Sequence, residues 1–150
     1  LTGEAKNPSV YKEDYDFEIG KAITLREGSD ITIIASGTMV YEALKAAEVL
    51  FEQGISSTVL NMHTIKPVDT SAIQKACNST KLIVTVEEHS LIGGLGTAVA
   101  EVKTILHNAP PQLMIGLPDQ YDEGGEYRDI LERHGLTSQL IAKRIESQLE

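Results

Sequence analysis

The residue types that most often carry out chemistry occur together at Glu87, Glu88 and His89, directly after the β-favouring run 82–86. In open α/β sheets, ligands and partners usually dock at the carboxyl ends of strands. Neighbouring residues of a strand point to opposite faces, so Glu87 and Glu88 are not expected to act as a carboxylate pair. We therefore favour an interdomain salt bridge or hydrogen bond for His89, and a catalytic role for it stays open as the alternative.

A glycine-rich segment follows this cluster and leads into an apolar, helix-like stretch at 98–106. Its glycines are Gly93, Gly94 and Gly96. They lack the spacing of the dinucleotide fingerprint G-x-G-x-x-G and the Gly-Lys-Ser/Thr ending of a P-loop. Two interpretations stay open: a tight strand-to-helix turn or domain contact, which we favour, and a phosphate bound at the helix N-terminus.

No other combination of residues completes an active site. The four histidines show no metal-site spacing, and the single Cys77 lies in a helical stretch, which indicates a buried structural thiol. Ser36 lacks the first glycine of a G-x-S-x-G elbow and is interpreted as a turn residue. We expect Lys66, which precedes Pro67 in a stiff loop, to form an interdomain ion pair. The residues therefore predict no catalytic, cofactor-binding or metal-binding side chain here, and a domain whose chemistry lies elsewhere.

The composition is that of one acidic globular domain. The chain has 150 residues, of which 41% are hydrophobic, and a formal net charge of −9. That charge argues against nucleic acid or an anionic membrane as a partner, and no segment has the apolar length of a membrane span. One cysteine excludes an internal disulfide and suits a reducing compartment such as the cytoplasm. Because the chain begins at Leu1 rather than Met, we expect a processed product or an excised piece of a longer protein.

Apolar patterning predicts alternating strands and helices. The expected strands are 17–25, 30–35, 58–62, 82–86 and 112–116, and the expected helices are 38–53, 69–78, 98–106, 126–134 and 137–149. Thr38, Asp69 and Thr137 are the expected N-caps. This alternation predicts a three-layer α/β/α fold with a mostly parallel sheet. Residues 1–16 show no clear periodicity and indicate a linker or an extended arm.

The order of four motifs resembles the C-terminal domain of transketolases. The motifs are Asp16–Ala22, Glu42–Glu48, Thr64–Asp69 and Val86–Val99, and the resemblance runs from about residue 11 to 149. Each motif is weak alone, but the four together, in this order and spacing, are specific.

The resemblance implies a five-stranded sheet whose first strand, near Lys21–Leu25, is antiparallel to the others. It also implies that residues 17–150 form the transketolase C-terminal domain and that residues 1–16 are a linker or the tail of a preceding pyrimidine-binding domain. Residues 1–10 resemble the tail of the pyrimidine-binding domain, where many relatives carry an arginine that contacts the substrate phosphate. This chain has Glu4 there, so no substrate contact is carried over.

The resemblance further implies part of a cytoplasmic enzyme that transfers two-carbon ketol units between sugar phosphates, as in pentose phosphate metabolism. Thiamine diphosphate and Mg²⁺ are then held by the other domains, and the isolated domain is expected to be inactive. The expected partners are the remaining transketolase domains or an N-terminal subunit, in a homodimer or a heterotetramer. The candidate residues for an interdomain or anion contact are Glu87, Glu88, His89, Gly93, Gly94, Gly96 and Lys66.

Two sister families share this architecture and stay open as alternatives. The β subunits of 2-oxo acid dehydrogenases use the domain to contact an acyltransferase core. Deoxyxylulose-phosphate synthases end in a similar domain, and Gly116–Asp119 is similar to their sequence. A third alternative, of another class, is a small phosphate- or nucleotide-binding regulator that uses the Gly93–Gly96 turn.

Overall fold

The structure of the chain is a computed structural model that describes residues 8–11, 14–121 and 124–150. Its strands are β1 (Ile23–Arg26), β2 (Ile31–Ala35), β3 (Ser57–Asn61), β4 (Leu82–Ser90) and β5 (Gln112–Leu117). Its helices are α1 (Met39–Glu52), α2 (Thr70–Ser79), α3 (Leu95–Lys103), α4 (Tyr127–Arg133) and α5 (Ser138–Leu149). Of the predicted linker or tail at 1–16, residues 1–7 and 12–13 lie outside the described residues, and its assignment stays a prediction.

The five strands form one mixed sheet in the order β1-β3-β2-β4-β5. β1 pairs antiparallel with β3, and the pairs β2–β3, β2–β4 and β4–β5 are parallel. This arrangement confirms the predicted fold class and the antiparallel first strand. The connections after β2 and after β4 lead to opposite sides of the sheet, so the topological switch point lies between the carboxyl ends of β2 and β4.

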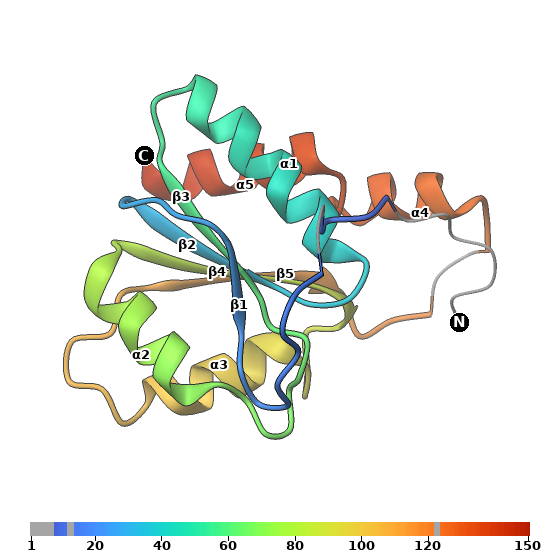
Figure 1. The fold of residues 1–150 in the computed structure, drawn as a ribbon. Coiled ribbons are helices and arrows are strands. Elements are labelled where there is room, and N and C mark those ends of the chain that lie inside the picture. Colours follow the sequence, from blue (N-terminus) through green and yellow to red (C-terminus); the bar gives the residue numbers. More distant parts are fainter. Residues whose placement is uncertain (1–7, 12–13, 122–123) are drawn as a thin grey trace.

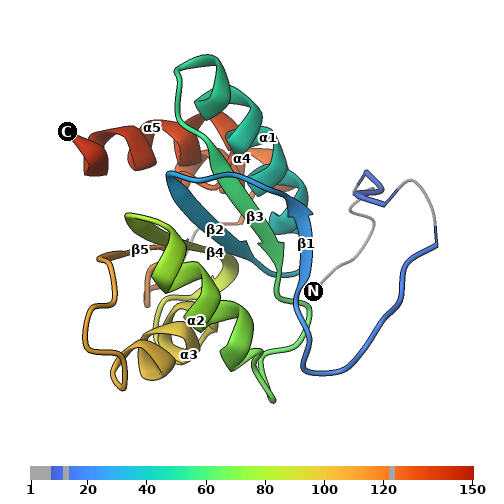
Figure 2. The same ribbon diagram turned by 60° about the vertical axis from the view of Figure 1, so that its left-hand side comes forward.

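Helices cover both faces of the sheet, as expected for a three-layer fold (Figure 1). Helices α1 and α5 pack together on one face, and α2 and α3 pack on the other. The rotated view separates the same two layers (Figure 2). The central strand β2 is buried along its whole length, and its isoleucines enter two hydrophobic cores, Ile31 and Ile33 on one face and Ile34 on the other. A continuous run of β-branched residues is typical of such a doubly covered strand.

The predicted strand at 17–25 is wrong in its first six residues. Gly20 has a φ of +82°, and the amide of Lys21 donates to the Glu18 carbonyl at 3.1 Å, so the chain turns before β1 begins. A left-handed φ of this kind is accessible to glycine at little cost and interrupts a strand. Pairing in the sheet therefore starts only at Ile23.

Two of the three predicted N-caps are wrong in their side-chain contacts. Asp69 caps α2 as expected, because its Oδ1 accepts from the amide of Ala72 at 3.0 Å. Thr38 stands at the N-cap of α1 but makes no capping hydrogen bond. Thr137 makes none at α5 either; there the carboxylate of Glu42 accepts from the amide of Ser138 at 2.7 Å.

Two apolar residues of the predicted helical stretches are exposed. Phe51, near the end of α1, is 61% exposed, and the Arg26 guanidinium lies 5.1 Å from the centre of its ring, a cation–π contact that suits a surface position. Ile105 lies beyond the end of α3 and is 71% exposed. Each residue stands at or past the terminus of its helix, where the apolar stripe no longer faces the sheet.

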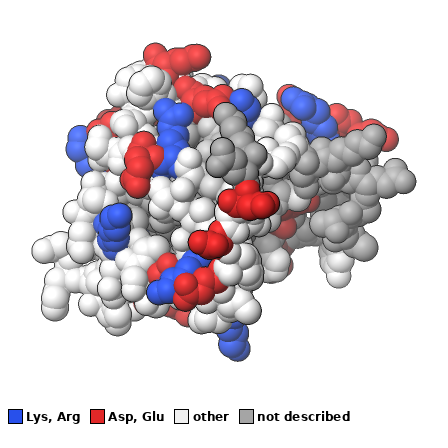
Figure 3. Space-filling view, viewed as in Figure 1, with Lys and Arg blue, Asp and Glu red and all other residues white. Residues whose placement is uncertain are grey.

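The surface carries charged side chains of both signs, and the single cysteine is buried. Acidic and basic side chains are interspersed over the face in Figure 3. Cys77 is buried, as expected, and burial raises the pKa of its thiol, although the Lys103 charge acts in the opposite direction. Within the described part of the chain, no helix is long and apolar enough to cross a membrane.

Candidate interdomain contact site

The cluster singled out from the sequence lies on β4 itself rather than after it. β4 extends to Ser90 and so includes Glu87, Glu88 and His89, which corrects the expectation that the strand ends near Val86. The extension lies at the carboxyl edge of the sheet, where Ser90 pairs with Leu117 of β5 after an irregularity in the register. β4 thus carries these side chains beyond the carboxyl end of β2.

Glu87 is a buried carboxylate that caps helix α3. Its side chain is 2% exposed, and its two oxygens accept from the backbone amides of Leu95 at 2.6 Å and Gly96 at 2.8 Å. The N-terminus of a helix carries partial positive charge and unpaired N–H groups, so a buried carboxylate there is stabilised. The sequence did not reveal this role, because a cap supplied eight residues upstream has no local signature.

The glycines that follow fit closely around that carboxylate. Gly93 has a φ of +77°, and its amide donates to the Thr97 hydroxyl at 3.0 Å. Gly94 has an ordinary φ, but a Cβ there would overlap the Glu87 carboxylate. A Cβ on Gly96 would lie 3.0 Å from the Thr85 hydroxyl and 3.1 Å from Met114. A tight strand-to-helix turn, one of the two interpretations left open, is therefore what these contacts require.

Glu88 points to the opposite side of β4, as the strand periodicity predicted. Its Oε2 accepts from the Thr38 hydroxyl at 2.5 Å and from the Tyr127 hydroxyl at 2.7 Å. Burial raises the pKa of Tyr127, and the bond to the Glu88 carboxylate raises it further, while the Thr38 hydroxyl lowers it. Glu88 thus ties the starts of α1 and α4 to β4. Tyr127 lies 39 residues away in the sequence, so no spacing rule could have paired the two.

His89 remains at the surface. Its side chain is 62% exposed, and its Nδ1 lies 2.9 Å from the Ser90 carbonyl and 3.9 Å from Oε2 of Glu87. Because a carbonyl oxygen only accepts, this geometry assigns a proton to Nδ1. The opposite ring nitrogen, Nε2, is then the acceptor of the neutral imidazole. Ile92, three residues further on, is 70% exposed.

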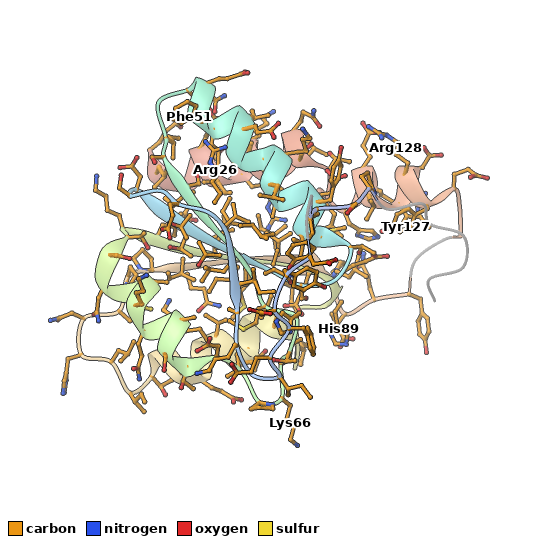
Figure 4. The ribbon with its side chains drawn as sticks, in the orientation of Figure 1. Arg26, Phe51, Lys66, His89, Tyr127 and Arg128 are labelled. Carbon is orange, nitrogen blue, oxygen red and sulfur yellow. The ribbon has the colours of Figure 1, made fainter. Side chains whose placement is uncertain are left out.

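Lys66 lies apart from this cluster. It stands in the loop between β3 and α2 and projects away from the domain, well separated from His89 (Figure 4). The structure therefore brings Glu87, Glu88, His89 and the glycines together, but not Lys66. Its predicted interdomain ion pair stays a prediction.

Among the residues that the structure describes, no group of three or more His, Cys, Asp or Glu side chains is arranged to hold a metal ion. The two α3 amides that a phosphate would use are also engaged by Glu87. These residues do not fit a diphosphate–metal site. At this edge of the sheet, the N-terminus of α3 is already capped by Glu87, and the side chains of His89 and Ile92 are exposed.

The model of the family described as transketolase, C-terminal domain, matches residues 20–141. The chain belongs to this family. One of the subunits of the apulose-4-phosphate transketolase from Phocaeicola vulgatus is 46% identical over 142 residues, which are 94% of this chain and 45% of that protein. The 1-deoxy-D-xylulose-5-phosphate synthase of a Synechococcus species is 44% identical over 88% of this chain and 20% of its own length.

Solved structures support the same assignment. A split-gene transketolase, described as an inactive β4 tetramer, matches with a TM-score of 0.85 at 38% identity, over 93% of this chain and 45% of that chain. The transketolase of Campylobacter jejuni matches with a TM-score of 0.63 at 22% identity, over 85% of this chain and 18% of its own, and shows the shared fold. This transketolase C-terminal domain thus spans less than half the length of the relatives it matches.

Proposed function

We propose that this domain is the third domain of an enzyme that transfers two-carbon ketol units between sugar phosphates, and that it serves assembly rather than chemistry. The observation that carries this proposal is the buried Glu87 carboxylate at the N-terminus of α3. It occupies the position where a fold of this kind commonly binds phosphate. The edge is left with His89 and Ile92 as exposed contact groups.

The cofactor of the proposed enzyme is thiamine diphosphate with Mg²⁺, which supplies the carbanion chemistry of ketol transfer when bound. We assign both to the other domains, because the described residues of this chain do not fit them. The contribution of this chain is to present the surface around His89 and Ile92 with a fixed backbone. Glu87 and the Gly93–Gly96 turn fix that backbone.

The proposed partners are the remaining domains of the enzyme, in the same chain or as a separate N-terminal subunit. Two observations support separate subunits: one relative is named as a single subunit of its enzyme, and a structural relative is a split-gene protein. A homodimer or heterotetramer in the cytoplasm is the assembly we propose. Lys66, at the tip of its loop, is proposed to pair with a carboxylate of that partner.

The sugar is proposed to be chosen by the other domains. A relative named for apulose 4-phosphate and one named for 6-deoxy-6-sulfo-D-fructose, from a Clostridium species, are both 46% identical to this chain. Because the similarity to proteins named for different sugars is equal, we infer that this domain does not determine which sugar is the substrate. Pentose phosphates are therefore one class of substrate among several that remain compatible with the domain.

A deoxyxylulose-phosphate synthase is the second candidate, favoured by the 44% identity to the Synechococcus protein. The acyltransferase-docking and phosphate-regulator alternatives have less support here. Retention of a lipoyl acyltransferase core by the immobilised chain would favour docking. Retention of labelled ADP or sugar phosphate in equilibrium dialysis would favour the regulator.

A chimera tests the proposal. The region of the Phocaeicola protein that this chain matches is replaced by this chain, and the chimera is mixed with the rest of that transketolase. We expect a complex that retains apulose-4-phosphate transketolase activity. A chimera that folds, as judged by its melting transition, but neither assembles nor restores activity would contradict the proposal.

A further inference from the structure

An extended stretch before the sheet, Asp14–Ile19, alternates acidic and apolar side chains. We call it the arm. All six side chains are exposed, and the arm belongs to no helix or strand. The apolar members, Tyr15, Phe17 and Ile19, are 48%, 58% and 68% exposed. Although residues 1–16 as a whole show no clear periodicity, these six residues alternate strictly, which is the pattern of a half-buried β-strand. The arm therefore has the sequence pattern of a strand, although it pairs with none of the strands that the structure describes.

The backbone of the arm forms almost no hydrogen bonds with the other residues that the structure describes. Among the described residues, only the Glu18 carbonyl of this stretch takes part in a backbone hydrogen bond, with the amide of Lys21 at 3.1 Å. An extended backbone with free N–H and C=O groups is a template for strand addition.

The arm is nevertheless held in place over the end of β3. The Phe17 ring lies 4.4 Å from the His63 ring, centre to centre, and the Tyr15 ring stacks on Tyr11 at 3.7 Å. Just after the arm, the amide of Gly20 donates to the Thr64 hydroxyl at 2.9 Å. Because the contacts of Phe17 and Gly20 anchor the arm to the domain, a strand that adds to it loses less ordering entropy than one that adds to a free chain.

The charges of the arm indicate which strand would fit. Asp14, Asp16 and Glu18 occupy alternate positions of the arm, which in a β-strand would place them on one face, and no ion pair joins them to another described residue. Pairing with a second copy would place carboxylate opposite carboxylate in every register that keeps the apolar face aligned, which is destabilising. A strand with Lys or Arg at alternate positions places opposite charges across the pair instead.

We propose that the arm binds, by β-strand addition, an extended segment of a partner protein that carries basic residues alternating with apolar ones. The apolar residues of that segment would lie beside Phe17 and Ile19. This inference goes beyond the proposed function, since it requires neither a cofactor nor the other transketolase domains. Its test is likewise independent of enzyme assembly.

The probe is a fluorescent hexapeptide of alternating lysine and valine, and the control peptide replaces each lysine with glutamate. Fluorescence anisotropy at low ionic strength should show binding of the lysine peptide only, weakened by added salt as screening increases. The combined substitutions Asp14→Asn, Asp16→Asn and Glu18→Gln should weaken binding at least tenfold. The matched control removes three exposed charges elsewhere, by Glu101→Gln, Asp129→Asn and Glu132→Gln, and should leave the affinity within twofold.

Amide hydrogen exchange of the complex gives the second readout. Strand addition should protect every second amide of the arm, because alternate residues of a strand face the partner. Absence of binding, equal weakening by the two triple variants, or binding without alternating protection would each overturn the proposal.

Discussion

The Glu87 carboxylate occupies the space where Gly94 would carry a side chain. The same oxygen, Oε2, accepts from the amide of Leu95 at 2.6 Å, so neither group has room to move without breaking the cap of α3. The glycine is therefore required by close approach and not by its φ, which is −96°.

Gly94→Val should destabilise the domain by about 1–3 kcal/mol, the usual cost of overpacking a close-packed site. Gly124→Val is the control, because nothing lies within 4 Å of a Cβ at that exposed glycine. Chemical denaturation of the two variants measures the difference. An unchanged unfolding midpoint for the Gly94 variant would show that the contact is not required.

Glu87→Gln should destabilise the domain by about 2–3 kcal/mol, since hydrogen bonds to a charged group are strong and the new NH₂ group faces a backbone N–H. Glu101→Gln, on the exposed surface of α3, should change stability by less than about 0.5 kcal/mol. Urea unfolding with exchange of the Leu95 and Gly96 amides reports both the global and the local effect. Equal stabilities for the two variants would rule out the cap as an important contact.

Ile92 and Ile105 provide a matched pair for the contact face. They are 70% and 71% exposed and stand at opposite ends of α3. In the chimeric enzyme, Ile92→Glu should weaken subunit association at least tenfold, whereas Ile105→Glu should leave it unchanged; neither should alter the melting temperature of the isolated chain. Analytical ultracentrifugation measures the association. If both variants assemble normally, the face around His89 is not the interface.

The phenol of Tyr127 should lose its proton at a higher pH than an ordinary tyrosine does. Burial and the Glu88 bond raise the pKa of its phenol, so an ultraviolet titration of phenolate should show one component above the ordinary tyrosine pKa of about 10 that Tyr127→Phe removes. The pKa of the Tyr127 phenol is higher in the folded state than in the unfolded state. Its contribution to stability is therefore fully present below the ordinary tyrosine pKa and is lost as the pH rises through the pKa of the folded state. A titration curve unchanged by the substitution would contradict this assignment.

The parts of the fold predicted from sequence are those fixed by local pattern. The β-branched run at 30–35 was predicted as a strand and forms β2, and Asp69 lies in sequence next to the helix that it caps. Residues 17–19 show the limit of this approach, because they were predicted to begin a strand whereas the turn at Gly20 separates them from the sheet.

The contacts of the candidate site could not be predicted in the same way. Glu87 reaches the start of α3 across eight positions, and Glu88 meets Thr38 and Tyr127 across 50 and 39. Such pairs depend on which strands are neighbours and on where β4 ends, and composition and periodicity do not specify either. The sequence singled out these residues, but their partners came only with the structure.

Calorimetric titration of the 150-residue chain with thiamine diphosphate and Mg²⁺ tests the central claim most directly, with the assembled chimeric enzyme as the positive control. The account predicts no heat of binding and no rise in melting temperature for the chain alone, and saturable binding by the assembled enzyme. Saturable binding of the cofactor by the isolated chain would contradict the claim that this domain serves assembly and leaves cofactor binding to its partners.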